Sequence, residues 1–172
     1  MKIKKFKTIS STHTYLKENN SKYTENTVIL AEEQTGGIGT KGRNWHTGSN
    51  KNIAMSMLFR PQKNVKNLEG LTIEIAKRIQ KIMEQKYNMK LTIKEPNDLM
   101  LNEKKICGIL TESNTIGNKI NYIIISIGFN VNEDKFPNEL ENIATSLYKE
   151  TGKEFNIQKI IEDFIKTLED II

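Results

Sequence analysis

One segment of the sequence concentrates the residue types that bind anions. Residues 33–45 contain four glycines, the cations Lys41 and Arg43, and the only tryptophan of the chain, Trp45. Glycine lets a backbone approach a ligand closely, and successive free N–H groups beside cations form a concave, positive surface. The pattern predicts a loop that binds a phosphate or a carboxylate, with Trp45 covering a ring. The alternative is a surface loop in which Trp45 only anchors the core.

The glycine spacing also matches a nucleotide-binding fingerprint, but its context does not. Gly37-x-Gly39-x-x-Gly42 has the spacing of the dinucleotide-binding motif, which requires a helix to begin inside the loop. Residues 44–50 have the composition of a continuing loop, and a strand is expected after them, so no helix begins where the motif requires one. A P-loop is also missing, because Lys41 is followed directly by Gly42. The sequence therefore predicts a phosphate-binding loop of another kind.

A second polar segment, residues 94–98, contains Lys94, Pro96, Asn97 and Asp98. Proline restricts the backbone before it to extended conformations, which places the amide and the carboxylate at a strand end. Such a pair commonly forms only an Asx-turn. In the functional alternative, Asn97 binds a base or a sugar and Asp98 orients a cation.

Lys105 begins the third polar segment, which continues to Leu110. On a regular strand Cys107 shares the face of Lys105, and Gly108 points the opposite way. Glycine inside a strand often marks the close approach of a ligand or of another backbone. We interpret Cys107 as a small buried residue rather than a nucleophile, since no histidine is near it in sequence.

Two further segments could display binding groups. Residues 126–132 end an apolar run with Gly128 and Asn130, which indicates a strand terminus. Residues 10–13 offer hydroxyls that either cap a helix or bind a ligand. We interpret His13 and His46 as structural or surface residues.

Hydrophobic periodicity predicts the elements that position these segments. Strands are expected at residues 2–9, 27–32, 53–59, 91–94, 99–101, 105–113 and 120–127. Helices are expected at 12–18, at 65–87 and at a C-terminal apolar stripe from Ile157 to Ile172. A strand-rich centre with flanking helices is typical of an α+β domain, and 172 residues fit a single domain, 1–172.

Composition excludes several classes of protein. The chain has no run of 18 apolar residues, and its basic N-terminus lacks the apolar stretch of a signal peptide. A single cysteine excludes an internal disulfide and fits a reducing cytosol, so we expect a cytoplasmic protein. The histidines and the cysteine lack metal-ligand spacing. The net charge of +5 is scattered among glutamates, which does not favour nucleic acid but can attract anionic ligands.

Taken in order, these segments resemble the catalytic domain of biotin protein ligases. The family shows Ser-Thr-Asn, then Gln-Thr-x-Gly-Arg-Gly-Arg-x-Gly-Arg-x-Trp, Lys-Trp-Pro-Asn-Asp, Lys-x-x-Gly-Ile-Leu, Gly-x-Gly-x-Asn and Ala-Thr-Ser-Leu. The corresponding segments here are residues 11–13, 34–45, 94–98, 105–110, 126–130 and 144–147. Six motifs in order with matching spacing make the resemblance specific.

The resemblance implies a fold related to class II aminoacyl-tRNA synthetases, with a mixed, mostly antiparallel central sheet flanked by helices. It implies a two-step reaction in which biotin and ATP, with Mg²⁺, form biotinyl-adenylate. A lysine of the biotin carrier domain of a biotin-dependent carboxylase then takes the biotinyl group. Neither DNA nor a membrane is an expected partner. The resemblance leaves open whether the chain forms a homodimer.

The resemblance also implies residue roles. Catalysis is assigned to Lys105, Arg43 and Asp98, with Lys105 as the cation near the carboxylate and the α-phosphate. Biotin binding is assigned to Ser11, Thr12, Gln34, Gly37, Lys105 and Gly108. ATP binding is assigned to Gly39, Lys41, Gly42, Arg43, Trp45, Lys94, Asn97 and Asn130. No protein metal site is expected, and the glycine-rich loop would close over the adenylate and exclude water.

The sequence departs from the family pattern at several positions. Ile38 and Thr40 stand where the loop has arginines, and His13, Glu95 and Ser126 stand where asparagine, tryptophan and glycine are expected. Neither the N-terminal helix-turn-helix nor the C-terminal β-barrel of the family is expected, and so no repressor function. Two alternatives therefore stay open: a lipoate or octanoyl ligase or transferase of the same fold, and a degenerate, non-catalytic biotin-binding module.

Overall fold

The computed structural model describes residues 1–48, 50–61, 68, 70–117 and 119–172 of the chain. Within these residues the strands are β1 (Lys2–Ile9), β2 (Thr27–Gln34), β3 (Ile53–Phe59), β4 (Thr92–Lys94), β5 (Asp98–Leu101), β6 (Lys104–Ile116) and β7 (Lys119–Phe129). The helices are α1 (Thr12–Asn19), α2 (Leu71–Tyr87), α3 (Leu147–Thr151) and α4 (Ile157–Leu168), with 3₁₀ turns at Asn20–Lys22 and Thr40–Gly42.

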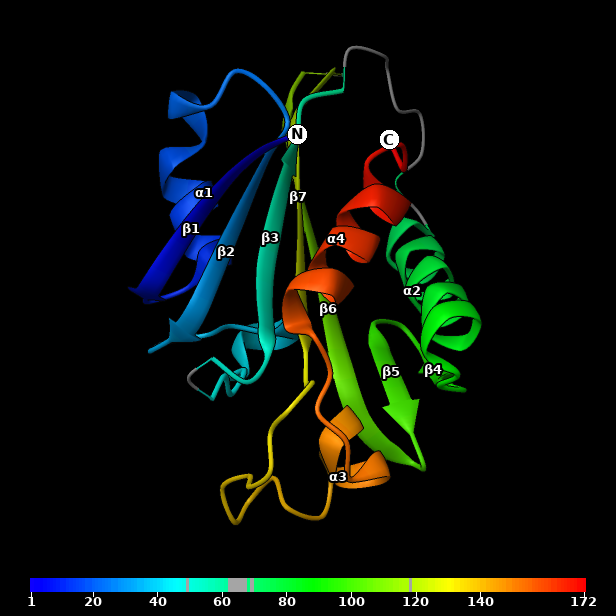
Figure 1. The fold of residues 1–172 in the computed structure, drawn as a ribbon. Coiled ribbons are helices and arrows are strands. Elements are labelled where there is room, and N and C mark those ends of the chain that lie inside the picture. The colour runs from blue at the N-terminus through cyan, green and yellow to red at the C-terminus, as the bar shows by residue number, and fades with distance from the viewer. Residues whose placement is uncertain (49, 62–67, 69, 118) are drawn as a thin grey trace.

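The strands form one seven-stranded sheet in the order β1-β2-β3-β7-β6-β5-β4 (Figure 1). Among the strands named above, β1 and β2 pair in parallel and the other neighbouring strands pair antiparallel. The expected α+β fold with a mixed, mostly antiparallel sheet is therefore confirmed. Among the described residues we find no helix with the length and hydropathy that a membrane span requires.

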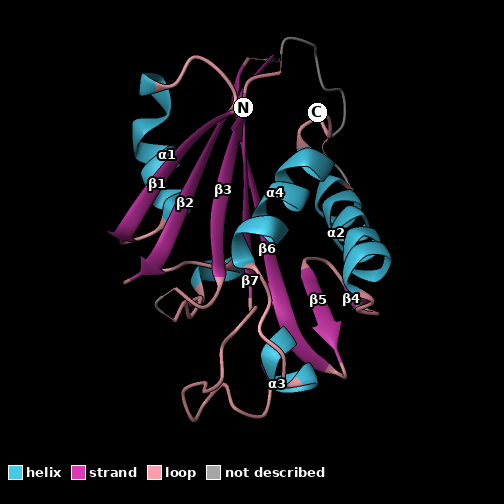
Figure 2. Ribbon diagram, in the orientation of Figure 1, coloured by secondary structure: helices cyan, strands magenta, loops and turns pink. Residues whose placement is uncertain are grey.

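Helices cover both faces of this sheet (Figure 2). Successive side chains of a strand point to opposite faces, so each strand contributes to two cores. The larger core lies under α2 and α4, where Phe129 and Phe164 pack edge to face with ring centroids 5.4 Å apart. The smaller core lies under α1 and contains Leu16, Leu58 and Ile124.

Most predicted elements are confirmed, and the helix ends are corrected. The predicted start of the long helix at residue 65 lies outside the described residues, and Leu68 is not helical, because the helix begins at Leu71 after Gly70 in the left-handed conformation. The last helix ends at Leu168, so Ile171 and Ile172 extend its apolar stripe without being helical. The short helix α3 was not predicted.

The sheet face toward α1 changes character from one end to the other. Leu58 pairs with Ile124 in the row of residues beneath α1. The next row is Ser56, Ser126 and Leu110. The third row is Ala54, Gly128 and Gly108. The register of the strands therefore places two serines next to each other just beyond the helix, and then alanine and two glycines in the following row. Because these last residues have small side chains or none, the sheet leaves room for a site there.

Candidate active site

Trp45 lies over the row of glycines. A Cβ atom at Gly128 would lie 2.2 Å from Trp45 Cε2, and one at Gly108 would lie 2.9 Å from Trp45 Cζ3. These distances are far below van der Waals contact, so both glycines are required by the position of the indole. The close approach predicted at Gly108 is therefore made by a side chain of the protein itself.

The loop that carries Trp45 (residues 35–45, here the glycine loop) folds as a tight hairpin. Trp45 N donates to Gly37 O at 2.8 Å, and Gly39 N donates to Arg43 O at 2.7 Å. The turn uses the left-handed conformation at Lys41 and Gly42, with φ of 58° and 70°. Gly37 is packed against this hairpin, since its Cβ would lie 2.5 Å from Trp45 O. Glycine at 37 and 42 thus serves the fold of the loop.

Two cavities flank the indole. The inner cavity lies beside α1 and is lined by Ser11, Thr12, His13, Gln34, Asn97, Gly108 and Ser126, among others. The outer cavity is lined by Arg43, His46, Lys94, Asp98, Glu103, Asn130 and residues 140–144, among others. Trp45, Lys105, Gly39 and Thr40 line both. The predicted biotin-binding and ATP-binding residues thus gather around one site, apart from Gly37, Lys41 and Gly42, which line neither cavity.

Lys105 lies at the junction of the two cavities. Its Nζ is 2.7 Å from Asp98 Oδ1 and 5.4 Å from the centroid of the Trp45 ring. The prediction that Cys107 shares the face of Lys105 is wrong. A β-bulge between β5 and β6 places Lys105 opposite Met100 and Cys107 opposite Leu99, and the Lys105 side chain lies beside Gly108.

Cys107 is buried in the larger core, which agrees with our interpretation of its role. Burial raises the pKa of its thiol well above the usual range, although the charge of Lys105 opposes this shift. The thiol is therefore protonated at neutral pH and is not a nucleophile.

The base of the inner cavity is polar. Ser11 caps α1, since its Oγ accepts from Thr14 N at 3.3 Å. Gln34 Oε1 accepts from Thr12 N at 2.8 Å, and Gln34 Nε2 donates to Thr47 Oγ1 at 3.2 Å. These contacts orient the Gln34 amide and hold it against the start of the helix.

His13 and Ser126 also line the inner cavity, which we did not predict from the sequence. His13 Nδ1 lies 2.8 Å from Ser126 Oγ, and Nε2 lies 3.2 Å from Glu112 Oε2. Burial lowers the pKa of His13, and the hydrogen bond to Glu112 opposes this shift without cancelling it. The sequence did contain one indication that the two residues are related: His13 and Ser126 both depart from the family motif, which has asparagine and glycine at these positions.

Buried polar atoms without partners mark the outer side of the site. Asn130 Nδ2 donates to Thr145 O at 3.0 Å, while its Oδ1 has no partner among the described residues. Trp45 Nε1 is likewise buried without an acceptor in the described part of the chain. Asn97 Nδ2 donates to Asp98 Oδ1 at 2.8 Å. An orphaned acceptor is suited to a donor such as an exocyclic amine of a base, because leaving it unpaired is costly.

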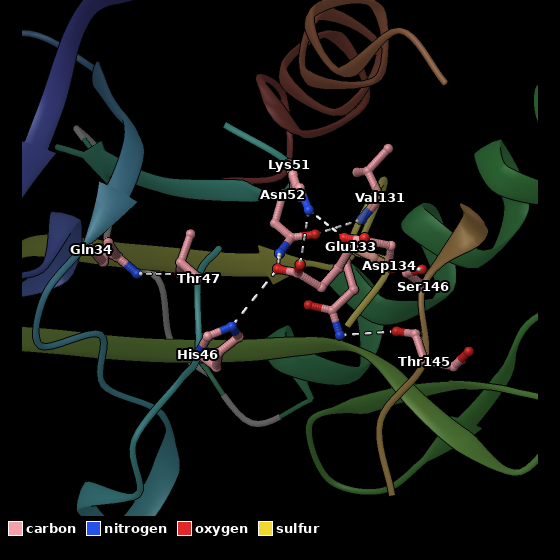
Figure 3. A network of polar contacts seen from close by, with 11 residues as sticks. Gln34, His46, Thr47, Lys51, Asn52, Val131, Glu133, Asp134, Thr145 and Ser146 are labelled. Carbon is pink, nitrogen blue, oxygen red and sulfur yellow. Dashed lines mark hydrogen bonds and ion pairs between the residues drawn. The ribbon is translucent and has the colours of Figure 1, made fainter. Parts of the chain in front are cut away.

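A second polar network holds the segment that follows Trp45 (Figure 3). Glu133 is buried, and its Oε2 accepts from Asn52 Nδ2 at 2.9 Å and lies 3.7 Å from His46 Nε2. Lys51 Nζ lies 3.8 Å from Glu133 Oε1. Gly48 packs directly against this carboxylate. The network therefore fastens the outgoing end of the glycine loop to the chain after β7.

A Gly128→Ala substitution is expected to displace Trp45. Its methyl group needs the space that the indole occupies, and such overpacking costs about 1–3 kcal/mol. Trp45 is the only tryptophan, so its fluorescence should shift toward that of an exposed indole. Gly36→Ala is the matched control, because the nearest atom to its Cβ is 3.6 Å away. Unchanged fluorescence in Gly128→Ala would contradict the packing described here.

Comparisons with known proteins agree with this geometry. The model of the biotin/lipoate A/B protein ligase family matches residues 5–130. The chain is 35% identical over 152 residues to the bifunctional ligase/repressor BirA of Bacillus spizizenii, covering 87% of this chain and 47% of that protein. It is 30% identical over 139 residues to the biotin–[acetyl-CoA-carboxylase] ligase of Paracoccus denitrificans, covering 78% and 58%. The chain spans about half the length of these curated relatives.

The structure is similar to that of the Aquifex aeolicus biotin protein ligase in complex with biotin and ATP. The TM-score is 0.86 at 29% identity, with 99% of this chain and 69% of that chain covered. The expected ligase-like fold, which is related to class II synthetases, is thus confirmed. The sequence match, the sheet and the site lead to one conclusion: the chain belongs to the biotin/lipoate A/B protein ligase family.

Proposed function

We propose that the protein uses ATP to ligate biotin to a lysine of a biotin carrier domain, through biotinyl-adenylate. The observation that carries this proposal is the position of Lys105, which lines both cavities and lies between them. A reaction that joins a carboxylate to a phosphate needs a cation where the two anions meet. The solved structure with biotin and ATP supports the same two ligands for this chain.

In the first step the inner cavity holds the ring system of biotin, with its carboxylate directed toward Lys105. The outer cavity holds ATP, with its α-phosphate on the other side of the same ammonium group. The biotin carboxylate attacks the α-phosphorus, and pyrophosphate leaves. Arg43 and Lys94 supply further positive charge along the outer cavity. Asn130, with its free acceptor, is suited to the adenine amine.

Magnesium, when bound with ATP, neutralises charge on the phosphates. The carboxylates that line the outer cavity and could approach it are Asp98 and Glu103. Asp98 is already paired with Lys105, so its first role is to orient the ammonium group. These oxygen donors fit the preference of magnesium for carboxylate and phosphate oxygens.

In the second step a lysine amine of the carrier attacks the carbonyl carbon of the mixed anhydride, and AMP leaves. The glycine loop lies over the junction and would shield the adenylate from water. The name of the Paracoccus relative supports a carrier domain of acetyl-CoA carboxylase as the acceptor. We propose a cytoplasmic location, which fits the single free cysteine of the chain.

The direct test is to incubate the chain with biotin, ATP, magnesium and a carrier domain, and then to measure the intact mass of the carrier. We expect one added biotinyl group, and none on a carrier whose acceptor lysine is replaced by arginine. Labelling by lipoate instead of biotin would favour the alternative ligase. Binding of biotin without labelling would favour the non-catalytic module. Either result would overturn the proposal.

Restoring arginines to the glycine loop should slow the release of the adenylate. Ile38 and Thr40 line the inner cavity, and Thr40 also lines the outer one. An Ile38→Arg/Thr40→Arg variant places charge-assisted donors there, so we expect dissociation of biotinyl-adenylate to slow by about tenfold. Ile38→Met/Thr40→Gln, with long neutral side chains, is the matched control. An equal dissociation rate in both variants would contradict a role of the loop in retention.

A further inference from the structure

A chain of hydrogen bonds runs beneath the inner cavity from α1 through β3 to β7. Thr12 Oγ1 lies 2.8 Å from Ser56 Oγ, which lies 2.7 Å from Ser126 Oγ. Ser126 Oγ in turn lies 2.8 Å from His13 Nδ1. Each of these four side chains is at most 8% exposed, and each makes the hydrogen bonds named here to its neighbours in the series. The direction in which each hydroxyl donates is therefore set by the two ends of the chain.

Glu112 determines the direction of the hydrogen bonds at the His13 end of this series. His13 Nε2 lies 3.2 Å from Glu112 Oε2, and Lys17 Nζ holds the other carboxylate oxygen at 3.0 Å. An ionised carboxylate only accepts hydrogen bonds, so Nε2 carries the proton. Burial lowers the pKa of His13 against the opposing effect of Glu112, and the ring is neutral at neutral pH. Nδ1 is then an acceptor.

A neutral His13 fixes every donor in the chain. Because Nδ1 accepts, the hydroxyl of Ser126 donates to it and must accept from Ser56. Ser56 must therefore accept from Thr12. Thr12 Oγ1 lies within hydrogen-bond distance of two acceptors, Ser56 Oγ at 2.8 Å and Gln34 Oε1 at 3.1 Å, and its one proton can serve only one of them. The hydrogen-bond chain directs that proton to Ser56, in place of the longer bond to Gln34 Oε1.

At the Thr12 end of the hydrogen-bond series, acceptor atoms then face the inner cavity. Gln34 Oε1 accepts from Thr12 N, and its second lone pair stays available. Thr12 Oγ1, having donated to Ser56, also retains lone pairs. Ser11 Oγ accepts from Thr14 N, and its proton has no acceptor among the described residues. The base of the cavity thus offers acceptors together with one donor.

We propose that His13 and Ser56 are positioning residues which make the inner cavity specific for a ligand head that carries N–H donors beside a carbonyl, as a urea does. The inference rests on the proposed function and adds the chemistry by which the same site chooses its substrate. A dithiolane or alkyl head has no N–H group, and it would bury the free acceptors without partners. Sites with unpaired polar groups reject such analogues strongly.

The first test needs no ligand. Nitrogen NMR of the His13 ring distinguishes a protonated from an unprotonated nitrogen. We expect Nε2 to be protonated and Nδ1 to be unprotonated at neutral pH. Glu112→Gln is expected to change this pattern, because its amide can also donate. A proton on Nδ1 in the wild-type chain would reverse the hydroxyl chain and overturn the inference, whatever the ligand proves to be.

The second test measures biotin affinity by calorimetry. Ser56 does not line the cavity, yet in Ser56→Ala the proton of Thr12 turns to Gln34 Oε1 and removes an acceptor. We expect the affinity to fall about tenfold, as loss of one such hydrogen bond implies. Thr27→Val is the matched control, since it removes a buried hydroxyl that donates to Glu25 O at 2.9 Å, away from the inner cavity. Its affinity should equal that of wild type.

A double-mutant cycle separates positioning from a general structural effect. In a Thr12→Val background the hydroxyl that Ser56 directs is absent, so Ser56→Ala should cause no further loss. Losses that add in the double variant, or unchanged affinity in Ser56→Ala, would overturn the inference. Failure of the wild-type protein to bind biotin would instead overturn the proposed function. The protonation of the His13 ring nitrogens would still show in which direction the hydrogen bonds from Thr12 to His13 are donated.

Discussion

A Lys105→Met variant is expected to form biotinyl-adenylate about 10²–10³ times more slowly than the wild-type chain, which is the usual effect of removing one group that stabilises developing charge. Methionine keeps the apolar stem of the side chain nearly unchanged, with sulfur in place of one methylene, and lacks the ammonium group. Without it, the two reacting anions meet beside Asp98, whose carboxylate then lacks its partner at 2.7 Å. The rate is measured as pyrophosphate release in the absence of a carrier.

Two further variants make this prediction specific. Lys104→Met removes the neighbouring lysine, which lines neither cavity and whose Nζ contacts Glu141 O at 3.5 Å, and it should leave the rate nearly unchanged. Lys105→Met/Asp98→Asn removes both charges of the pair, and it should recover part of the lost rate because the unpaired carboxylate is gone. A loss below tenfold in Lys105→Met would contradict its place at the reacting atoms.

The strands were predictable because their signal is local. The bounds of β1 and β3 agree with the predicted ranges, since alternation and flanking polar residues depend on neighbours in sequence. The glycine loop and the polar strand ends were also recognisable by residue type. The parallel pairing of β1 with β2 was not predicted, because it depends on which strands meet in space.

The details of the site depend on register, which sequence reasoning did not supply. Trp45 fits only because Gly108 and Gly128 fall side by side on adjacent strands. A single bulge moved Lys105 to the face opposite the one predicted. The contacts of His13 could not be predicted from the sequence, because its partners, Ser126 and Glu112, lie about 100 residues away along the chain. Contacts of that range follow from the fold and not from local pattern.

A Glu133→Ala substitution is expected to lower the free energy of unfolding by about 2–3 kcal/mol, the range for leaving buried partners of a charged group unsatisfied. Asn52 is buried, and its amide loses an acceptor at 2.9 Å. Lys51 and His46 are partly exposed, so water can replace their longer contacts. The loss of the Asn52 contact therefore dominates the cost. Urea unfolding measures this change.

The consequence should reach the site, because Asn52 joins two segments. Its Oδ1 accepts from Val131 N at 2.9 Å while its Nδ2 holds Glu133, so the loss of Glu133 frees residues 46–48 from the chain after β7. Amide exchange in that segment should accelerate. Glu133→Gln keeps an acceptor for Asn52 and should cost about 1 kcal/mol or less. Asp134→Ala removes an exposed partner of Lys51 and should leave the free energy of unfolding nearly unchanged. If all three variants were equally stable, the buried contact would not be what fastens the glycine loop over Lys105.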